Sequence, residues 1–89
     1  MTDEYFAKND KGEYLHMNLY VMVGENELVH ECDVYFDTEQ EHIDIDVIEV
    51  EDNPALSAYL NTMLIDNYDF KKSLIQDIEN RIKIESLYR

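Results

Sequence analysis

Two alternating stretches on either side of a glycine constrain this chain most strongly. Residues 14–23 and residues 28–37 each carry an apolar side chain at every second position, with Gly24 between them. A period of two is typical of a half-buried β-strand, and Gly and Asn favour a hairpin turn. We therefore expect an antiparallel hairpin with this inner face: Leu15, Met17, Leu19, Val21, Val23, Leu28, His30, Cys32, Val34 and Phe36.

A third strand is predicted over residues 42–50, after a turn at residues 38–41. Ile43, Ile45 and Val47 are expected to face the core, and the adjacent Val47 and Ile48 break the alternation as a β-bulge would. If residues 24–27 form the first turn, Val21 lies opposite His30. The second turn would then place Asp33 across from Asp46.

Helices are predicted after residue 53. Asn53 is a good N-cap and Pro54 suits the first helical position. Apolar residues at helical spacing follow: Leu56, Tyr59, Leu60, Met63 and Leu64. Asp69 is the expected N-cap of a second helix, and the last ten residues fit either a helix or a strand, with the helix favoured.

These elements predict an α+β fold in one small domain of residues 1–89. A three-stranded antiparallel β-meander over residues 14–50 packs on one or two C-terminal helices over residues 53–89. Residues 1–12 are a loose lead-in or a short strand, so a fourth strand at a terminus is the open alternative. A chain of 89 residues with 45% hydrophobic content supports one modest core.

The charge is distributed unevenly along the chain. Residues 12–70 contain fifteen Asp and Glu and no Lys or Arg, whereas residues 71–89 contain five basic and three acidic residues. The net charge of −14 exceeds the magnitude of about 2–8 usual for a small domain. Salt adaptation, a general solubilising surface and weak calcium binding are alternative explanations, but self-repulsion on this scale favours a functional role for the field.

The outward positions of the predicted strands form the candidate partner-binding site. They are Glu31, Asp33, Asp37, Asp44, Asp46 and Glu49, with Tyr20 and Tyr35 among them. Alternate residues on a strand are about 6.6–6.8 Å apart, so such a face presents regularly spaced negative charge, as a nucleic-acid backbone does. Tyrosine is enriched at protein interfaces. The expected partner is therefore a basic nucleic-acid-binding protein, such as a nuclease, a CRISPR effector, or a restriction or repair enzyme.

In size and charge the chain resembles the small acidic inhibitors that phages use against restriction, CRISPR or repair enzymes, and the immunity proteins of bacterial nucleases. The resemblance implies a nucleic-acid mimic that blocks another protein's binding channel. The alternative is a non-catalytic interaction module or homodimer, whose interface would use open sheet edges and Ile75, Ile78, Ile82 and Leu87.

Other function classes are disfavoured. No phosphate-binding glycine loop, catalytic pattern or metal-ligand spacing is present, so we expect no enzyme activity, no cofactor and no metal. The acidic surface argues against direct binding of nucleic acid or anionic membrane. A single cysteine and no apolar stretch long enough for a membrane span indicate a cytoplasmic protein.

Overall fold

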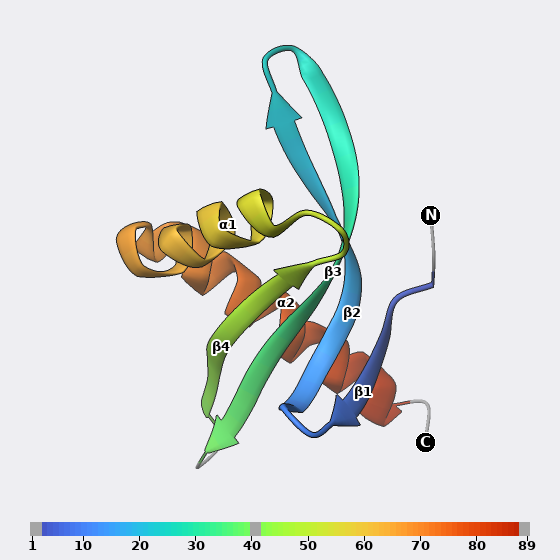
Figure 1. Ribbon diagram of the computed structural model, residues 1–89. Helices are drawn as coiled ribbons and strands as arrows, with labels where there is room; N and C mark the ends of the chain where they lie inside the picture. The colour runs from blue at the N-terminus through green and yellow to red at the C-terminus, as the bar shows by residue number, and fades with distance from the viewer. Residues whose placement is uncertain (1–2, 40–41, 88–89) are drawn as a thin grey trace.

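The computed structural model describes residues 3–39 and 42–87, and shows an α+β protein in which a four-stranded antiparallel sheet precedes two helices (Figure 1). The strands follow one another in the sheet in chain order, as a meander. Their bounds are β1 Tyr5–Asn9, β2 Gly12–Val23, β3 Asn26–Glu39 and β4 His42–Val50. The three expected strands are thus confirmed, and the open alternative of a fourth strand is realised by β1 at the N-terminal end.

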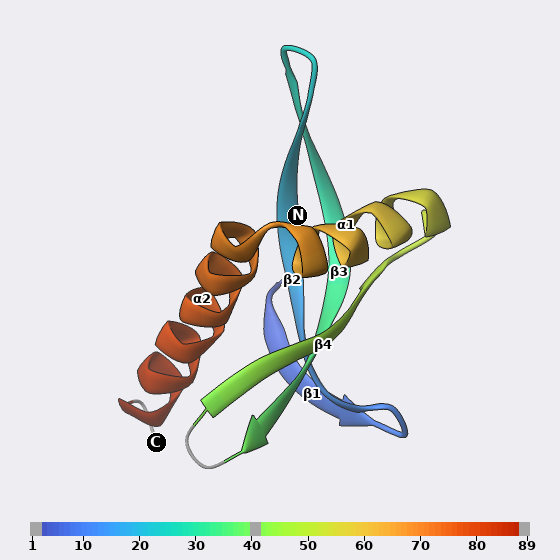
Figure 2. The same cartoon turned by 90° about the vertical axis from the view of Figure 1, so that its left-hand side faces the viewer.

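Both helices, α1 (Pro54–Asp66) and α2 (Tyr68–Leu87), lie against the same face of the sheet (Figures 1 and 2). This inner face and the helices enclose the core, which contains Leu15, Met17, Cys32, Val34, Phe36, Ile43, Ile45, Ile48, Val50, Leu60, Leu64, Leu74 and Ile78. The alternating stretches therefore bury the predicted side at Leu15, Met17, Cys32, Val34 and Phe36, whereas Leu28 near the hairpin tip is 44% exposed. The opposite side, the outer face, has no helix against it in the described part of the chain (Figure 1).

The hairpin register differs by two residues from the expected one. The loop between β2 and β3 contains only Gly24 and Glu25, so Val21 pairs with Leu28 and His30 lies opposite Leu19. Gly24 has a φ of +65°, which glycine adopts without strain and which the first residue of a tight hairpin turn requires. A shift of two keeps every side chain on its expected face but changes its cross-strand neighbours.

The bulge in β4 lies one residue earlier than expected. The pairing of β3 with β4 is irregular between Tyr35, which pairs with Val47, and Phe36, which pairs with Ile45. Asp46 is the extra residue, and Ile48 becomes the core position at 1% exposure. The expectation that Val47 faces the core is therefore wrong, because the bulge turns it to the side of Tyr35.

The acid pairing also changes. Asp33 lies across from Glu49, and Asp37 lies across from Asp44. The expected pairing of Asp33 with Asp46 is wrong, because β4 is shifted along β3 and Asp46 falls in the bulge. The expectation of a turn at residues 38–41 is wrong for Thr38 and Glu39, because β3 continues to Glu39, and residues 40–41 lie outside the described residues.

Side chains of α1 protect the outer edge of β4. The Asn61 amide accepts a hydrogen bond from the Ile48 N–H at 2.8 Å and donates one to the Ile48 carbonyl at 2.9 Å. The Ser57 hydroxyl accepts from the Val50 N–H at 2.8 Å. These bonds satisfy backbone groups that an edge strand otherwise leaves available for pairing with another chain.

The helix starts are built from asparagine caps. The Asn53 side chain accepts from the Leu56 N–H and Pro54 opens α1, which confirms the expected start. The second cap is Asn67, whose side chain accepts from the Phe70 N–H at 3.1 Å, so the expectation of Asp69 as the cap is wrong. The C-terminal ambiguity is resolved as helix through Leu87, and residues 88–89 lie outside the described part.

Candidate functional site

The outer face of the sheet carries most of the predicted partner-binding residues. Alternation along β3 places Glu31, Asp33, Tyr35 and Asp37 on this face, and the register adds Asp44 and Glu49 from β4. They form two groups, one on each side of Tyr35. Asp33 and Asp37 are four residues apart on β3, so the groups are separated by about 13 Å.

The first group, which we call the His16 cluster, consists of Tyr5, His16, Glu31, Asp33 and Glu49. A single cross-strand row joins Tyr5 to His16, His16 to Asp33, and Asp33 to Glu49. The His16 ring stacks on the Tyr5 ring with centroids 5.0 Å apart. Its Nδ1 lies 2.6 Å from Asp33 Oδ1 and its Nε2 lies 3.3 Å from Glu31 Oε1.

This arrangement favours a protonated His16. The hydrogen bond to Asp33 raises the pKa of His16, and the bond to Glu31 adds to it, although burial of the ring acts in the opposite direction. The His16 side chain is only 14% exposed, so solvent screens its charge weakly. The imidazolium thus holds Glu31 and Asp33 together and offsets part of their mutual repulsion.

An open pocket of about 350 Å³ adjoins the His16 cluster. Its lining includes Tyr5, Glu31, Asp33 and Glu49, together with Glu51 at the end of β4. Tyr5 is 50% exposed, so an aromatic surface is accessible beside carboxylates. A pocket of this composition suits a cationic side chain, since carboxylates accept its hydrogen bonds and an aromatic ring attracts its charge.

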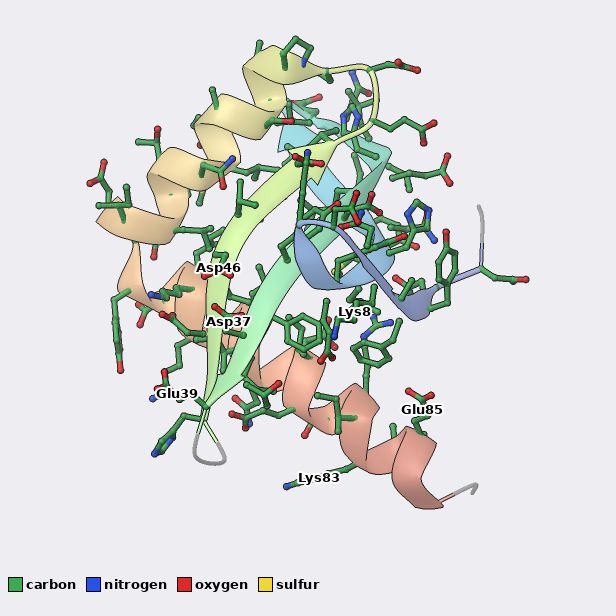
Figure 3. All side chains as sticks on the ribbon, turned by 60° about the horizontal axis from the view of Figure 1, so that its bottom comes forward. Lys8, Asp37, Glu39, Asp46, Lys83 and Glu85 are labelled. Atoms are coloured by element: carbon green, nitrogen blue, oxygen red, sulfur yellow. The ribbon has the colours of Figure 1, made fainter. Side chains whose placement is uncertain are left out.

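The second group, the Asp46 cluster, consists of Asp37, Asp44 and Asp46 near the far end of the β3–β4 hairpin (Figure 3 labels Asp37 and Asp46). Burial raises the pKa of Asp46, and the hydrogen bond to Asp37 and repulsion from Asp37 and Asp44 raise it further. Asp44 is paired with Lys71 of α2, with Nζ and Oδ1 3.0 Å apart. Like charges placed this closely destabilise a strand pair, and the Lys71–Asp44 ion pair offsets part of this repulsion.

The two predicted tyrosines do not lie in either cluster. Tyr35 is 3% exposed, and its hydroxyl accepts a hydrogen bond from the Asn9 side chain at 2.9 Å. The expectation of an exposed Tyr35 is therefore wrong, because Tyr14, Lys11 and the β1–β2 turn cover its ring. Tyr20 is 54% exposed, but it lies farther along β2, opposite Val29.

Sequence reasoning missed the contribution of cations from outside residues 12–70. Lys11 Nζ lies 2.6 Å from Glu49 Oε1, and Lys71 pairs with Asp44. It also missed His16, since the expected register placed this residue opposite Tyr35. Because the loop has only two residues, His16 lies opposite Asp33. The signal for this contact in the sequence was the outward position of His16 in the alternating stretch.

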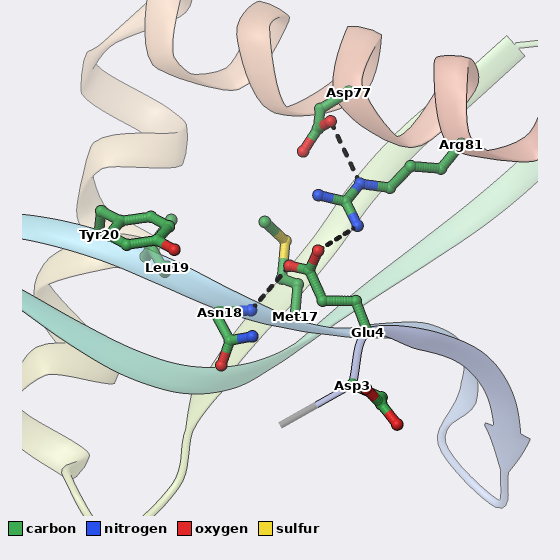
Figure 4. Close-up of a pocket in the computed structure, with 8 residues that line it drawn as sticks. All are labelled: Asp3, Glu4, Met17, Asn18, Leu19, Tyr20, Asp77 and Arg81. Atoms are coloured by element: carbon green, nitrogen blue, oxygen red, sulfur yellow. Dashed lines mark hydrogen bonds and ion pairs between the residues drawn. The ribbon is translucent and has the colours of Figure 1, made fainter. Parts of the chain in front are cut away.

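A larger open pocket lies between β2 and α2, and Arg81 is one of the residues that line it (Figure 4). Arg81 donates to Glu4 at 2.8 Å and to Asp77 at 3.2 Å, and the second Glu4 oxygen accepts from the Asn18 N–H at 3.0 Å. Burial opposes the shift, but the bonds from Arg81 and Asn18 lower the pKa of Glu4. These bonds fasten the N-terminal segment to α2, so we assign them a structural role.

Other chemistry has little support in the described residues. Within residues 3–39 and 42–87, no three His, Cys, Asp or Glu side chains are grouped so as to hold a metal ion. Cys32 is 1% exposed, and burial raises the pKa of its thiol to about 12. Its sulfur therefore stays protonated in the core at neutral pH.

Comparison with known proteins adds no constraint. No family model, curated protein or solved structure matches this chain. None of the helices in the described residues combines the length and the apolar character that crossing a membrane requires. The surface of the protein is therefore the basis of the functional proposal.

Proposed function

We propose that this protein is a small acidic inhibitor that mimics nucleic acid and blocks the DNA- or RNA-binding site of another protein. The observation that carries the proposal is the outer face. Two groups of carboxylates lie there about 13 Å from each other, one on each side of the buried Tyr35. The basic residues that reach these groups come from outside residues 12–70 and neutralise Glu49 and Asp44. His16 offsets part of the charge of Glu31 and Asp33 in the first group, and Asp37 and Asp46 add negative charge in the second.

The electrostatics support binding to a basic channel. A surface with one sign of charge speeds association with a complementary surface and discriminates against other partners. Like-charge pairs on the sheet, such as Asp37 with Asp44, weaken the isolated fold. A partner that supplies Lys and Arg would neutralise these carboxylates and remove the repulsion, so binding would stabilise the folded protein.

The test is displacement of a fluorescent duplex from purified nucleic-acid-binding enzymes: a restriction nuclease, a CRISPR effector with guide RNA and a repair nuclease. The parent chain should displace the duplex from one of them. The Asp37→Asn/Asp46→Asn variant should displace it at least about tenfold less well, a difference of about 1.4 kcal/mol. Asp37 and Asp46 are preferable to Asp33 because Asp33 also bonds His16.

The matched control is Asp66→Asn/Asp69→Asn, which removes the same charge at the exposed junction of α1 and α2. This control should displace the duplex within about twofold of the parent, because it leaves the outer face unchanged. That result would exclude bulk charge as the cause of the weaker displacement. Equal weakening by both pairs would show that net charge, and not the outer face, determines binding. Failure of the parent chain with all of these enzymes would contradict the proposal.

A non-catalytic interaction module is the second candidate. Exposed apolar residues favour it, including Ile65 near the end of α1 at 85% and Tyr68 at the start of α2 at 74% exposure. The interface suggested by Ile75, Ile78 and Ile82 is disfavoured, because Ile78 is fully buried and the other two pack against the core. Under this candidate, the outer-face variant would bind its partner as well as the parent does.

A further inference from the structure

The hairpin formed by β2 and β3 extends well beyond the rest of the sheet (Figures 1 and 2). Pairing with β1 ends at His16, and pairing with β4 ends at Cys32. We call residues 18–31 the arm. In the described part of the chain, no strand pairs with either edge of the arm beyond those two positions.

The arm is apolar on both of its faces. On the outer side, Tyr20 is 54%, Met22 63% and Val29 44% exposed, and on the inner side Leu28 is 44% exposed. An isolated two-stranded ribbon is only marginally stable in water, and exposing apolar residues on it adds no stability. Such a concentration of apolar surface beyond the core is typical of an interaction site.

The charged side chains of the arm are all acidic. Glu25 lies at the tip, Glu27 follows it, and Glu31 lies at the base beside His16. No Lys or Arg occurs between residues 12 and 70. A second copy of this chain would bring acidic tip against acidic surface, so the charge disfavours self-association through the arm and favours a basic partner.

We infer that the arm inserts into a basic, apolar-floored groove of the same nucleic-acid-binding partner. This inference rests on the proposed function and adds the element that enters the channel. Tyr20, Met22 and Val29 contact the apolar floor of the groove, and Glu25 at the tip and Glu27, which pairs with Met22 on the same side, meet cations beside that floor. A two-stranded β-ribbon fits the major groove of B-DNA, which is about 12 Å wide, so the arm is narrower than a duplex and fits a channel that accepts one.

The experiment uses the enzyme from which the parent chain displaces the labelled duplex. The arm variant is Tyr20→Thr/Met22→Thr/Val29→Thr, which preserves the charge and keeps residues that favour strands. It should displace the duplex at least about tenfold less well than the parent. The control is Tyr59→Gln/Ile65→Gln, which removes exposed apolar side chains from α1 and should leave displacement within about twofold of the parent.

The single variant Met22→Thr and urea unfolding of each variant separate loss of contact from loss of fold. Met22→Thr should displace the duplex about threefold less well while keeping the parent's unfolding midpoint. If the arm variants are folded and displace the duplex like the parent, while Asp37→Asn/Asp46→Asn is weaker, the arm inference is overturned and the proposed function stands.

Two further results would also overturn the inference. If the parent displaces the duplex from none of the enzymes, the proposed function fails and the arm inference fails with it. If sedimentation shows a dimer of the parent that the arm variant dissociates, the arm binds a second copy and not a basic partner.

Discussion

The His16 cluster makes a quantitative prediction about pH and stability. His16 and Asp33 form a close contact of 2.6 Å, with their side chains 14% and 32% exposed. Hydrogen bonds to charged groups contribute about 1.5–3 kcal/mol, and solvent screening of the partly exposed Asp33 reduces this contribution. We therefore expect a coupling free energy of about 1–2 kcal/mol between these residues at pH 6.

The direction of the pH dependence follows from the raised pKa of His16. A histidine whose pKa is higher in the folded state contributes its full stability below its ordinary value of about 6.5. That contribution is lost as the pH rises through the pKa of the folded state. Glu31 also faces the ring and favours the same charged form, and the Tyr5 ring stacks on it.

A double-mutant cycle measures this coupling directly. Urea unfolding of the parent, His16→Gln, Asp33→Asn and the double variant gives the coupling free energy at each pH. It should decrease by about 1 kcal/mol between pH 6 and pH 9, leaving the smaller contribution of a neutral hydrogen bond. A coupling that is zero at pH 6, or that stays constant across the range, would refute an ionic His16–Asp33 contact.

Two other substitutions test the fold and the acidic face by urea unfolding. Asn61→Ala removes both hydrogen bonds to the backbone of the buried Ile48 and should lower the free energy of unfolding by about 2–3 kcal/mol. The control Thr62→Ala, at an exposed position, should lower it by less than about 0.5 kcal/mol. Equal effects of the two substitutions would contradict the protection of the β4 edge by Asn61. Asp46→Asn should stabilise the fold by several tenths of a kcal/mol at pH 7. Because the pKa of Asp46 is raised, this gain should disappear as the pH falls through it, and a destabilised variant would contradict the assigned repulsion.

The alternation of apolar residues was sufficient to predict the hairpin, its inner face and the α+β class. Its limit was the register, because a two-residue shift leaves the faces unchanged and therefore the hydrophobic pattern does not distinguish the two loops. This shift decides which charges meet. It brings His16 to Asp33, so a site that appeared to be a solvated row of acids contains an imidazole between carboxylates.

Local polarity concealed two other features. The segment Tyr5–Asn9 has only two large apolar residues, and it forms β1 because β2 offers an edge and Phe6 packs against the core. Tyr35 alternates as an outward residue, but its ring is covered by Tyr14 and by Lys11 from the β1–β2 turn. The periodicity of β3 does not show this cover, since it depends on the register that places Tyr14 opposite Tyr35 and on the β1–β2 turn that supplies Lys11.

The proposed function requires this protein and nucleic acid to compete for one site on the partner, and this competition is measurable. The concentration of parent chain that displaces half of the labelled duplex should be determined at several duplex concentrations, with the partner held constant. A nucleic-acid mimic predicts that this concentration rises linearly with the duplex concentration. A value independent of duplex concentration would place the binding site outside the nucleic-acid channel and contradict the mimicry.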